Sequence, residues 1–268
     1  MIAHVHRQRF DIQAGGHRLH AERLIPPSAA AGPTLVFLHE GLGSIGQWRN
    51  FPATVCARIG LPGLVYERWG FGRSAPLNGA RPKDYMHQEA CDSLPEVLEA
   101  SSITEPPILF GHSDGGSIAL LFAAAYPDRA RAVISEAAHV FIEEITLAGI
   151  RTARSVYEQG GLQHQLRRHH GDNTDMMFRG WCDTWLRPDF RDWNIETELR
   201  SITCPLLIIQ GEDDEYGTRA QVDTIAASVS GPTEILWLPD CAHIPHHQAR
   251  EPVLVALTNF IGRICASI

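Results

Sequence analysis

The sequence predicts an α/β protein with a mostly parallel β-sheet flanked by helices. Short apolar or alternating runs, each of strand length, recur along the chain, and helix-length segments separate most of them. This alternation is typical of a mostly parallel sheet with helices on both faces, in which ligands bind beyond the carboxyl ends of the strands. The expected strands are 19–25, 34–38, 63–66, 107–110, 132–135, 205–209 and 234–238.

The expected helices lie between these strands, at 44–60, 84–101, 115–126, 218–229 and 252–265. The alternation fails between residues 139 and 199, where large aromatic side chains occur without a convincing buried strand. A segment of this kind inside an α/β chain is most simply a helical insertion. We therefore expect a core formed by residues 1–138 and 200–268, and a helical cap, or lid, formed by residues 139–199.

Composition and charge argue against several classes of function. The 268 residues are 44% hydrophobic, which is enough to bury a sizeable core. The formal charge of −8 and the lack of any lysine or arginine run argue against nucleic acid as a partner. No window approaches the roughly 20 apolar residues of a membrane span, and the first ten residues carry charges where a signal peptide has an apolar core. A cytoplasmic enzyme with no membrane partner is the expectation.

Cysteine and histidine patterns argue against a metal site. The six cysteines form no C-x-x-C pair, so we expect most of them to be small buried hydrophobic residues. The histidines at 243–247 lie in a loop-like sequence without a glutamate at the spacing of zinc proteases. His169 and His170, beside two arginines, are expected on a solvated face of the lid. We therefore expect neither a metal nor a cofactor.

One motif decides the chemistry. Residues 111–115, GHSDG, form a G-x-S-x-G between an expected strand and an expected helix. The physics of this pattern is that of a tight turn, in which the serine takes a strained backbone conformation and small flanking residues let strand and helix approach. The hydroxyl of Ser113 is then pushed out of the sheet, which predicts a nucleophile.

Serine is a weak nucleophile until a base takes its proton, so Ser113 requires a histidine and a carboxylate that orients it. After such a turn, the acid and then the histidine follow at later strand ends. The stretch PLLIIQGEDDEYG supplies the acid after one strand, and EILWLPDCAHIPHH supplies the histidine after the next.

With these motifs the chain resembles the α/β-hydrolase fold superfamily of the Ser-Asp-His type, over nearly all of its length. The resemblance implies a mostly parallel eight-stranded sheet flanked by helices, with a helical lid inserted. The family's strand followed by G-x-x-D points to Asp214, with Asp213 as the alternative, and its histidine turn points to His243. His246 and His247 are neighbours that could be confused with the catalytic histidine.

The stretch HEGLGSIGQW at 39–48 contains a G-x-G-x-x-G, and Glu67 follows the stretch about 20 residues downstream, as in a dinucleotide-binding loop. Two strand-like segments precede this loop, however, and bulky residues follow its third glycine. Glu67 also matches an acid that is part of a turn in the family's Y-D-x-R-G-x-G-x-S segment. We therefore assign the glycines to acyl-transfer chemistry.

Acyl transfer creates an oxyanion that preorganised N–H groups must stabilise. One donor is the N–H of the residue after the nucleophile, Asp114. The family places the second donor in an H-G-G or H-G-x-G segment, which aligns here with His39 onward. This alignment predicts Gly41 as the donor, or Leu42 if the register slips by one.

Glu40 stands where the family usually has glycine. It is either a structural carboxylate paired with Arg68 or Arg73, or a pocket carboxylate that positions water or repels anionic substrates. We favour the structural role, because a carboxylate aimed at an oxyanion would oppose catalysis.

The expected function is hydrolysis of a small carboxylic ester or lactone through an acyl-enzyme on Ser113. A thioesterase or a carbon–carbon bond hydrolase on the same triad is the alternative. The fold also hosts cofactor-independent lyases and dioxygenases, and ligand receptors with slow turnover.

The lid gives limited information on the substrate. Trp181 and Trp185 are candidate pocket residues; alternatively, Trp181, Trp185 and Trp193 form the lid's own core. His139 is a further pocket candidate. Three lid arginines could hold a substrate carboxylate. The expected partner is a small-molecule acyl substrate, and a homodimer is possible. The arginines are Arg151, Arg154 and Arg179.

Overall fold

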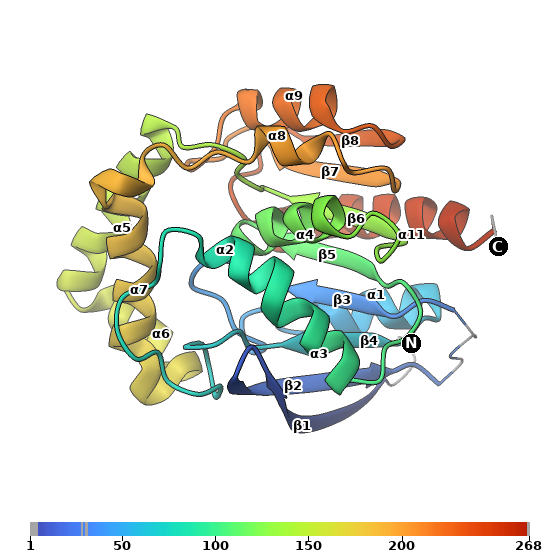
Figure 1. Cartoon of the computed structure of the whole chain (residues 1–268), viewed down its shortest axis with the longest axis horizontal. Coiled ribbons are helices and arrows are strands. Elements are labelled where there is room, and N and C mark those ends of the chain that lie inside the picture. Colours follow the sequence, from blue (N-terminus) through green and yellow to red (C-terminus); the bar gives the residue numbers. More distant parts are fainter. Residues whose placement is uncertain (1–4, 28, 30–31, 267–268) are drawn as a thin grey trace.

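A twisted eight-stranded sheet runs through the centre of the molecule (Figure 1). The computed structural model describes residues 5–27, 29 and 32–266. The strands are β1 (His6–Ala14), β2 (His17–Ile25), β3 (Leu35–Leu38), β4 (Gly63–Tyr66), β5 (Ile108–His112), β6 (Ala132–Glu136), β7 (Leu206–Gly211) and β8 (Thr233–Leu238). Their order is β1-β2-β4-β3-β5-β6-β7-β8. Because β2 pairs antiparallel with β1 and β4 while the other pairs are parallel, the predicted mostly parallel sheet is confirmed.

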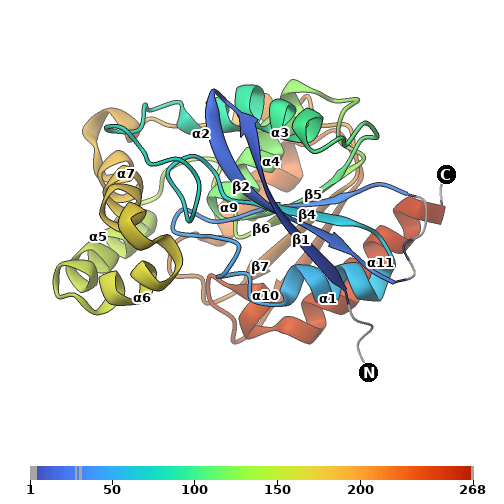
Figure 2. The ribbon, with the colours of Figure 1, turned by 90° about the horizontal axis from the view of Figure 1, so that it is seen from below.

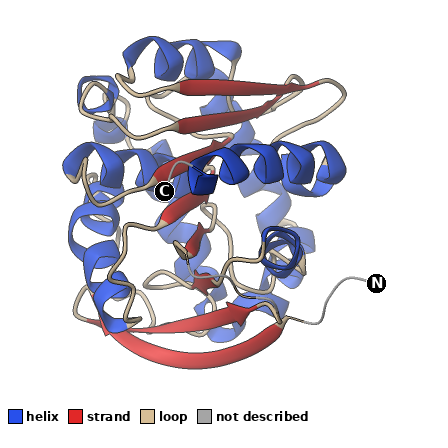
Figure 3. Ribbon diagram, turned by 90° about the vertical axis from the view of Figure 1, so that its right-hand side faces the viewer, coloured by secondary structure: helices blue, strands red, loops and turns tan. Residues whose placement is uncertain are grey.

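The strand β1 lies outside the strands expected from the sequence. Its sequence HRQRFDIQA is mostly exposed, since β1 is the edge of the sheet and carries charged side chains rather than an apolar run. It pairs with β2 through a tight turn at Gly15 and Gly16, both with positive φ. The long antiparallel pair curves along one edge of the sheet (Figure 3).

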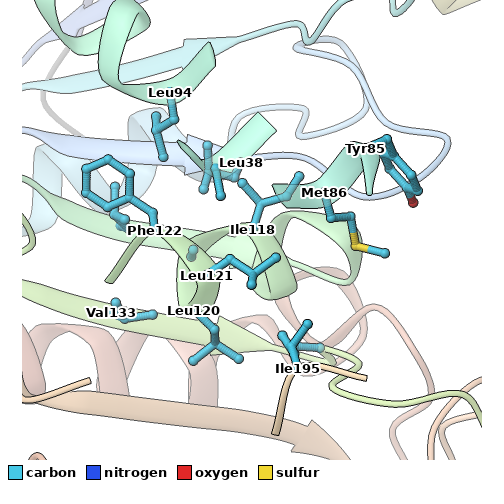
Figure 4. Packing of buried hydrophobic residues seen from close by; sticks show 14 of the residues in the cluster. Leu38, Tyr85, Met86, Leu94, Ile118, Leu120, Leu121, Phe122, Val133 and Ile195 are labelled. Carbon is cyan, nitrogen blue, oxygen red and sulfur yellow. The ribbon is translucent and has the colours of Figure 1, made fainter. Parts of the chain in front are cut away.

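Helices cover both faces of the sheet (Figure 2). Each face buries its own apolar cluster. On one face, Ile118 and Phe122 of the helix after β5 pack with Leu94 and Val133 (Figure 4). On the other face, Phe51 packs with the C-terminal helix. The helices of the two faces are α1 (Phe51–Ile59), α2 (Tyr85–Gln88), α3 (Leu94–Ala100), α4 (Asp114–Ala125), α8 (Glu196–Leu199), α9 (Arg219–Ser228), α10 (Pro245–Gln248) and α11 (Arg250–Ala266).

Three helices between β6 and β7 gather beyond the end of the sheet toward which the central strands point (Figure 1). They are α5 (Glu144–Glu158), α6 (Gly161–His170) and α7 (Thr174–Leu186). The two ends of this segment meet in an antiparallel bridge between Phe141 and Asn194, and the N–H of Ile195 donates to the carbonyl of Val140 at 2.8 Å. The two ends of the segment therefore lie side by side where it begins after β6 and ends before β7. The division into a core and a cap at residues 139–199 stays a prediction.

The cysteines behave as small apolar side chains. Four are buried, two are partly exposed, and all six are free thiols. No helix in the described part of the chain is long and apolar enough to cross a membrane.

The close approach of α4 to the sheet depends on Gly115. A Cβ at this position would lie 2.0 Å from the carbonyl oxygen of Leu38 in β3, and a backbone atom cannot move aside. We expect Gly115→Ala to lower the free energy of unfolding by about 3 kcal/mol or more. Urea denaturation measures the change.

Gly262→Ala is the matched control. It lies on the exposed side of α11, and no atom lies within 4 Å of the added Cβ. This substitution should raise the stability by about 0.5–1 kcal/mol, because alanine is the better helix former. Equal effects of the two substitutions would contradict the close approach.

Candidate active site

Ser113 occupies a strained turn between β5 and α4. Its backbone has φ 53° and ψ −119°, a conformation that L-residues rarely adopt. Its N–H donates to the carbonyl of Glu136 at 2.8 Å, which fixes the turn to the end of β6. A Cβ at Gly111 would lie 2.0 Å from the carbonyl oxygen of Gly115, so the turn closes only with glycine there. The predicted strain and close approach are confirmed.

The structure brings Ser113, His243 and Asp214 together from three separate strand ends. His243 Nε2 lies 3.0 Å from Ser113 Oγ, and His243 Nδ1 lies 2.9 Å from each carboxylate oxygen of Asp214. Asp213, the alternative acid, is exposed. His246 instead contacts the carboxylate of Glu136, and His247 contacts the carbonyl of Gln47. This is the hydrogen-bonded order of nucleophile, base and orienting acid that serine hydrolysis requires.

The carboxylate of Asp214 is buried and fully engaged. The N–H of Tyr216 and the side-chain amide of Gln210 donate to it at 2.8 and 2.7 Å. Burial raises the pKa of Asp214, but the charge of His243 and the hydrogen bonds outweigh burial and lower the pKa to about 2. Asp214 is therefore ionised at neutral pH and can orient the imidazole.

His243 is buried among acidic groups. Burial lowers its pKa, but the charge and hydrogen bond of Asp214, followed by the charges of Glu215 and Glu40, outweigh burial and raise the pKa above its ordinary value. Its backbone is also tied down, because the carbonyl of His243 accepts a hydrogen bond from His112 Nε2 at 2.7 Å. The imidazole is thus a strengthened base in a fixed position.

The two predicted oxyanion donors are free to bind a substrate oxygen. Within the described ranges, neither the N–H of Gly41 nor that of Asp114 has a hydrogen-bond partner. The N–H of Leu42, the alternative donor, is already held by the carboxylate of Glu40. A Cβ at Gly41 would lie 2.3 Å from Nε1 of Trp181, so glycine is needed where the loop meets α7.

The side chain of Arg68 holds the oxyanion loop to the nucleophile turn. Its buried Nη2 donates to the carbonyls of Glu40 at 2.9 Å and His39 at 3.2 Å, and lies 3.7 Å from the Asp114 carboxylate. Tyr85 also donates to that carboxylate, at 2.7 Å. Arg68 and Tyr85 therefore both contact the carboxylate of the acid beside the nucleophile.

The expected ion pair between Glu40 and Arg68 or Arg73 is wrong. Arg68 contacts the carbonyl of Glu40 rather than its carboxylate, because Asp114 competes for the guanidinium. The N–H of Arg73 donates to Glu67 instead. The Glu40 carboxylate lines the cavity in front of Ser113, and burial raises its pKa to about 7 despite the N–H of Leu42 and the charge of His243.

A cavity of about 170 Å³ lies against the triad, between the strand ends and the helices α5 and α7. No lysine or arginine of the described chain lines it, so the suggestion that lid arginines bind a substrate carboxylate is wrong there. Arg151 and Arg154 instead pair with exposed glutamates, and Arg179 lines a separate hollow. Besides the triad and its loops, the lining includes Leu42, His139, Thr146, Ile150, Trp181, Trp185, Glu215, Tyr216 and Ile244.

Both interpretations of the lid tryptophans apply. Trp181 and Trp185 line the cavity, and Trp185 also packs on Phe190 and Trp193 within the apolar cluster. Trp185 Nε1 donates to the hydroxyl of Tyr85 at 3.0 Å, which links α7 to the nucleophile turn. The cavity walls are thus part of the molecule's core.

Sequence reasoning missed six of the lining residues, which are His112, Thr146, Ile150, Glu215, Tyr216 and Ile244. Glu215 and Tyr216 follow Asp214 directly, so their place in the same strand-end loop could have been inferred. Thr146 and Ile150 on α5 carry no local signal, because only the packing of α5 over the sheet brings them to the cavity.

Two further sequence interpretations are resolved by the contacts. Glu67 is a turn acid, as expected, since its carboxylate accepts the N–H groups of Ile45 at 3.1 Å and Arg73 at 2.6 Å. The expectation of a solvated His170 is wrong: this side chain is buried and accepts the N–H of Gly72 at 2.9 Å. Burial lowers its pKa to about 4. His169 is only half-buried.

Comparison with known proteins identifies the family of the chain. A model of the α/β-hydrolase fold family matches residues 33–194, and the chain belongs to this family. It is 27% identical over 192 residues to the serine hydrolase BPHL of Homo sapiens, which covers 68% of this chain and 63% of that protein. The chain thus spans less than two thirds of this relative's length.

Solved structures share the fold over nearly the whole chain. An esterase from Thermogutta terrifontis superposes with a TM-score of 0.75 at 18% identity, covering 96% of this chain and 99% of that one. An enol-lactonase from Burkholderia xenovorans LB400 gives a TM-score of 0.74 at 17% identity, covering 94% of this chain and all (100%) of that one. At these identities the likeness shows the fold alone.

The two neighbouring aspartates provide a test of the triad. We expect Asp214→Asn to lower kcat/KM for a short p-nitrophenyl ester by about 10³- to 10⁴-fold, because the amide cannot hold the imidazole in the required tautomer. Asp213→Asn, on the exposed neighbour, should change kcat/KM less than about twofold. A larger loss at Asp213 would contradict the assignment.

The pH dependence tests the electrostatic role of Glu40. His243 must be neutral to act as a base, so activity should rise with pH through a midpoint above 6.5, the ordinary histidine value. Glu40→Gln removes a negative charge that raises the pKa of His243, so the midpoint should move to lower pH. Exposed Glu212→Gln should leave it in place. An unchanged midpoint in Glu40→Gln would contradict the coupling.

Proposed function

We propose that the protein is a serine hydrolase that cleaves a small, uncharged carboxylic ester or lactone through an acyl-enzyme on Ser113. The observation that carries this proposal is the 3.0 Å contact between Ser113 Oγ and His243 Nε2, two residues that line one cavity. An activated serine beside two unoccupied backbone N–H groups is suited to acyl transfer.

The cavity supports the choice of substrate class. Its volume of about 170 Å³ is well below the roughly 300–1,000 Å³ of pockets that hold drug-sized ligands. Its walls are mainly apolar and aromatic, Glu40 and Glu215 add acidic side chains, and no described lysine or arginine lines it. An anionic acyl group would meet like charge, so a neutral substrate is favoured.

The proposed mechanism uses only side chains and N–H groups of this chain. Ser113 Oγ attacks the acyl carbon as His243 Nε2 takes its proton, and Asp214 stabilises the imidazolium. The N–H groups of Gly41 and Asp114 donate to the oxyanion. His243 then protonates the leaving oxygen, and finally activates the water that hydrolyses the acyl-enzyme.

Glu40 fits this mechanism as a pocket carboxylate. Its carboxylate is held by the N–H of Leu42, which keeps it in the loop beside the oxyanion donors. With a pKa of about 7, a large fraction of Glu40 is uncharged near neutral pH, which limits its opposition to an oxyanion. Its ionised form would oppose anionic substrates.

A fluorophosphonate probe and a substrate panel test the proposal. The probe should label wild-type protein at Ser113 and leave Ser113→Ala unlabelled. Wild-type protein should turn over p-nitrophenyl acetate and a short lactone many times. It should hydrolyse the acetate at least tenfold faster than the anionic p-nitrophenyl hemisuccinate, measured as kcat/KM.

The other outcomes separate the rival functions. Labelling followed by a single turnover would indicate a ligand receptor, and preference for an acyl-CoA thioester would indicate a thioesterase. Absence of label on Ser113 would overturn the acyl-enzyme mechanism and favour a lyase or dioxygenase that uses the His243–Asp214 pair as a base.

A further inference from the structure

A second cluster of titratable side chains lies behind the triad. His112, Glu136 and His246 are all buried, and one donor atom from each lies within 4.8 Å of the other two. They come from the ends of β5 and β6 and from α10. The proposed hydrolytic mechanism uses none of their side chains.

The donor set suits a transition metal. Two imidazoles and a carboxylate form a common set of protein ligands for Zn²⁺, with bonds of about 2.0–2.2 Å. Metal ligands must be unprotonated. A neutral imidazole has one ring nitrogen with a free lone pair, and its other ring nitrogen is an N–H donor.

The orientation of His112 matches that of a metal ligand. Its Nε2–H donates to the carbonyl of His243 at 2.7 Å, and in the described part of the chain its Nδ1 has no hydrogen-bond partner. Metal-binding histidines almost always donate their second N–H to such an acceptor, which fixes the ring and its tautomer. Nδ1 is therefore the nitrogen available to an ion.

Glu136 is a buried acid with which no lysine or arginine of the described ranges pairs. Its side chain is fully buried, its Oε1 lies 2.5 Å from His246 Nδ1, and its Oε2 has no partner among the described residues. An unsatisfied buried carboxylate oxygen is costly. A divalent ion that replaced the shared proton would satisfy Glu136 Oε2 and bind His246 Nδ1.

The cluster has a route to solvent. His112 and His246 line a cavity of about 340 Å³ whose wall also includes His169 and His247. This cavity is distinct from the one in front of Ser113, although Glu40, His112 and Ile244 line both. Its volume leaves room for a water molecule as a fourth ligand.

We propose that His112, Glu136 and His246 form a binding site for a divalent transition-metal ion, with Zn²⁺ as the best-suited ion. The spacing of histidines along the chain does not reveal this site, because its three ligands are more than 20 residues apart in sequence from their nearest partner. Only the adjacency of β5 and β6, and the packing of α10 against them, brings the ligands together.

Zinc binding to the full chain tests the proposal. The protein is prepared without a histidine tag, stripped with a chelator, and titrated with ZnCl₂ by competition with a chromogenic chelator. We expect one equivalent per chain with a Kd below about 1 μM. Glu136→Gln and His246→Gln should each weaken binding at least 100-fold. His169→Gln and His247→Gln, in the same cavity but outside the cluster, should weaken it less than threefold.

A measurement on the native protein guards against variants that fail to fold. X-ray absorption of the zinc-loaded native chain should show two imidazole nitrogens and a carboxylate oxygen at about 2.0–2.2 Å. Binding weaker than about 10 μM, or equal affinity in all four variants, would overturn the site. So would a spectrum without imidazole or with three or more imidazoles. None of these readouts depends on hydrolytic activity.

Discussion

The backbone strain at Ser113 is the constraint on which the rest of the site depends. A φ of 53° at a non-glycine residue is unfavourable, and it persists because the turn is held from several sides. Glycines at 111 and 115 let β5, α4 and β3 come within contact of one another, and the serine N–H is bound by the end of β6. The parallel strands thereby place Ser113, Asp214 and His243 together beyond the carboxyl ends of the strands.

Three acidic residues, Asp114, Asp214 and Glu40, lie near this turn, and each is held by different contacts. Arg68 and Tyr85 contact the carboxylate of Asp114, and the backbone N–H of Asp114 has no partner among the described residues. Asp214 keeps its charge through hydrogen bonds and strengthens His243 as a base. Among the described residues no arginine or lysine pairs with the carboxylate of Glu40, and burial raises its pKa to about 7. Arg68 thus contacts the carboxylate of Asp114, whereas at Glu40 it contacts only the backbone carbonyl.

Much of the core and of the triad could be predicted from the sequence, because both rest on local patterns. The apolar runs match the buried strands, and the motifs at Ser113, Asp214 and His243 lie at strand ends. The edge strand β1 escaped prediction because its exposed side chains carry no apolar pattern. The partner of Glu40 was misjudged because Asp114 competes for Arg68, and no spacing in the sequence encodes that competition.

The central claim is that Ser113 forms a tetrahedral adduct whose oxygen is held by two backbone N–H groups. A crystal structure of the protein inhibited by a small alkyl fluorophosphonate tests this claim most directly. The claim predicts phosphorus bonded to Ser113 Oγ, with one phosphoryl oxygen about 2.7–3.1 Å from the nitrogens of both Gly41 and Asp114. A phosphoryl oxygen bound by the N–H of Leu42, or turned away from both predicted donors, would contradict it.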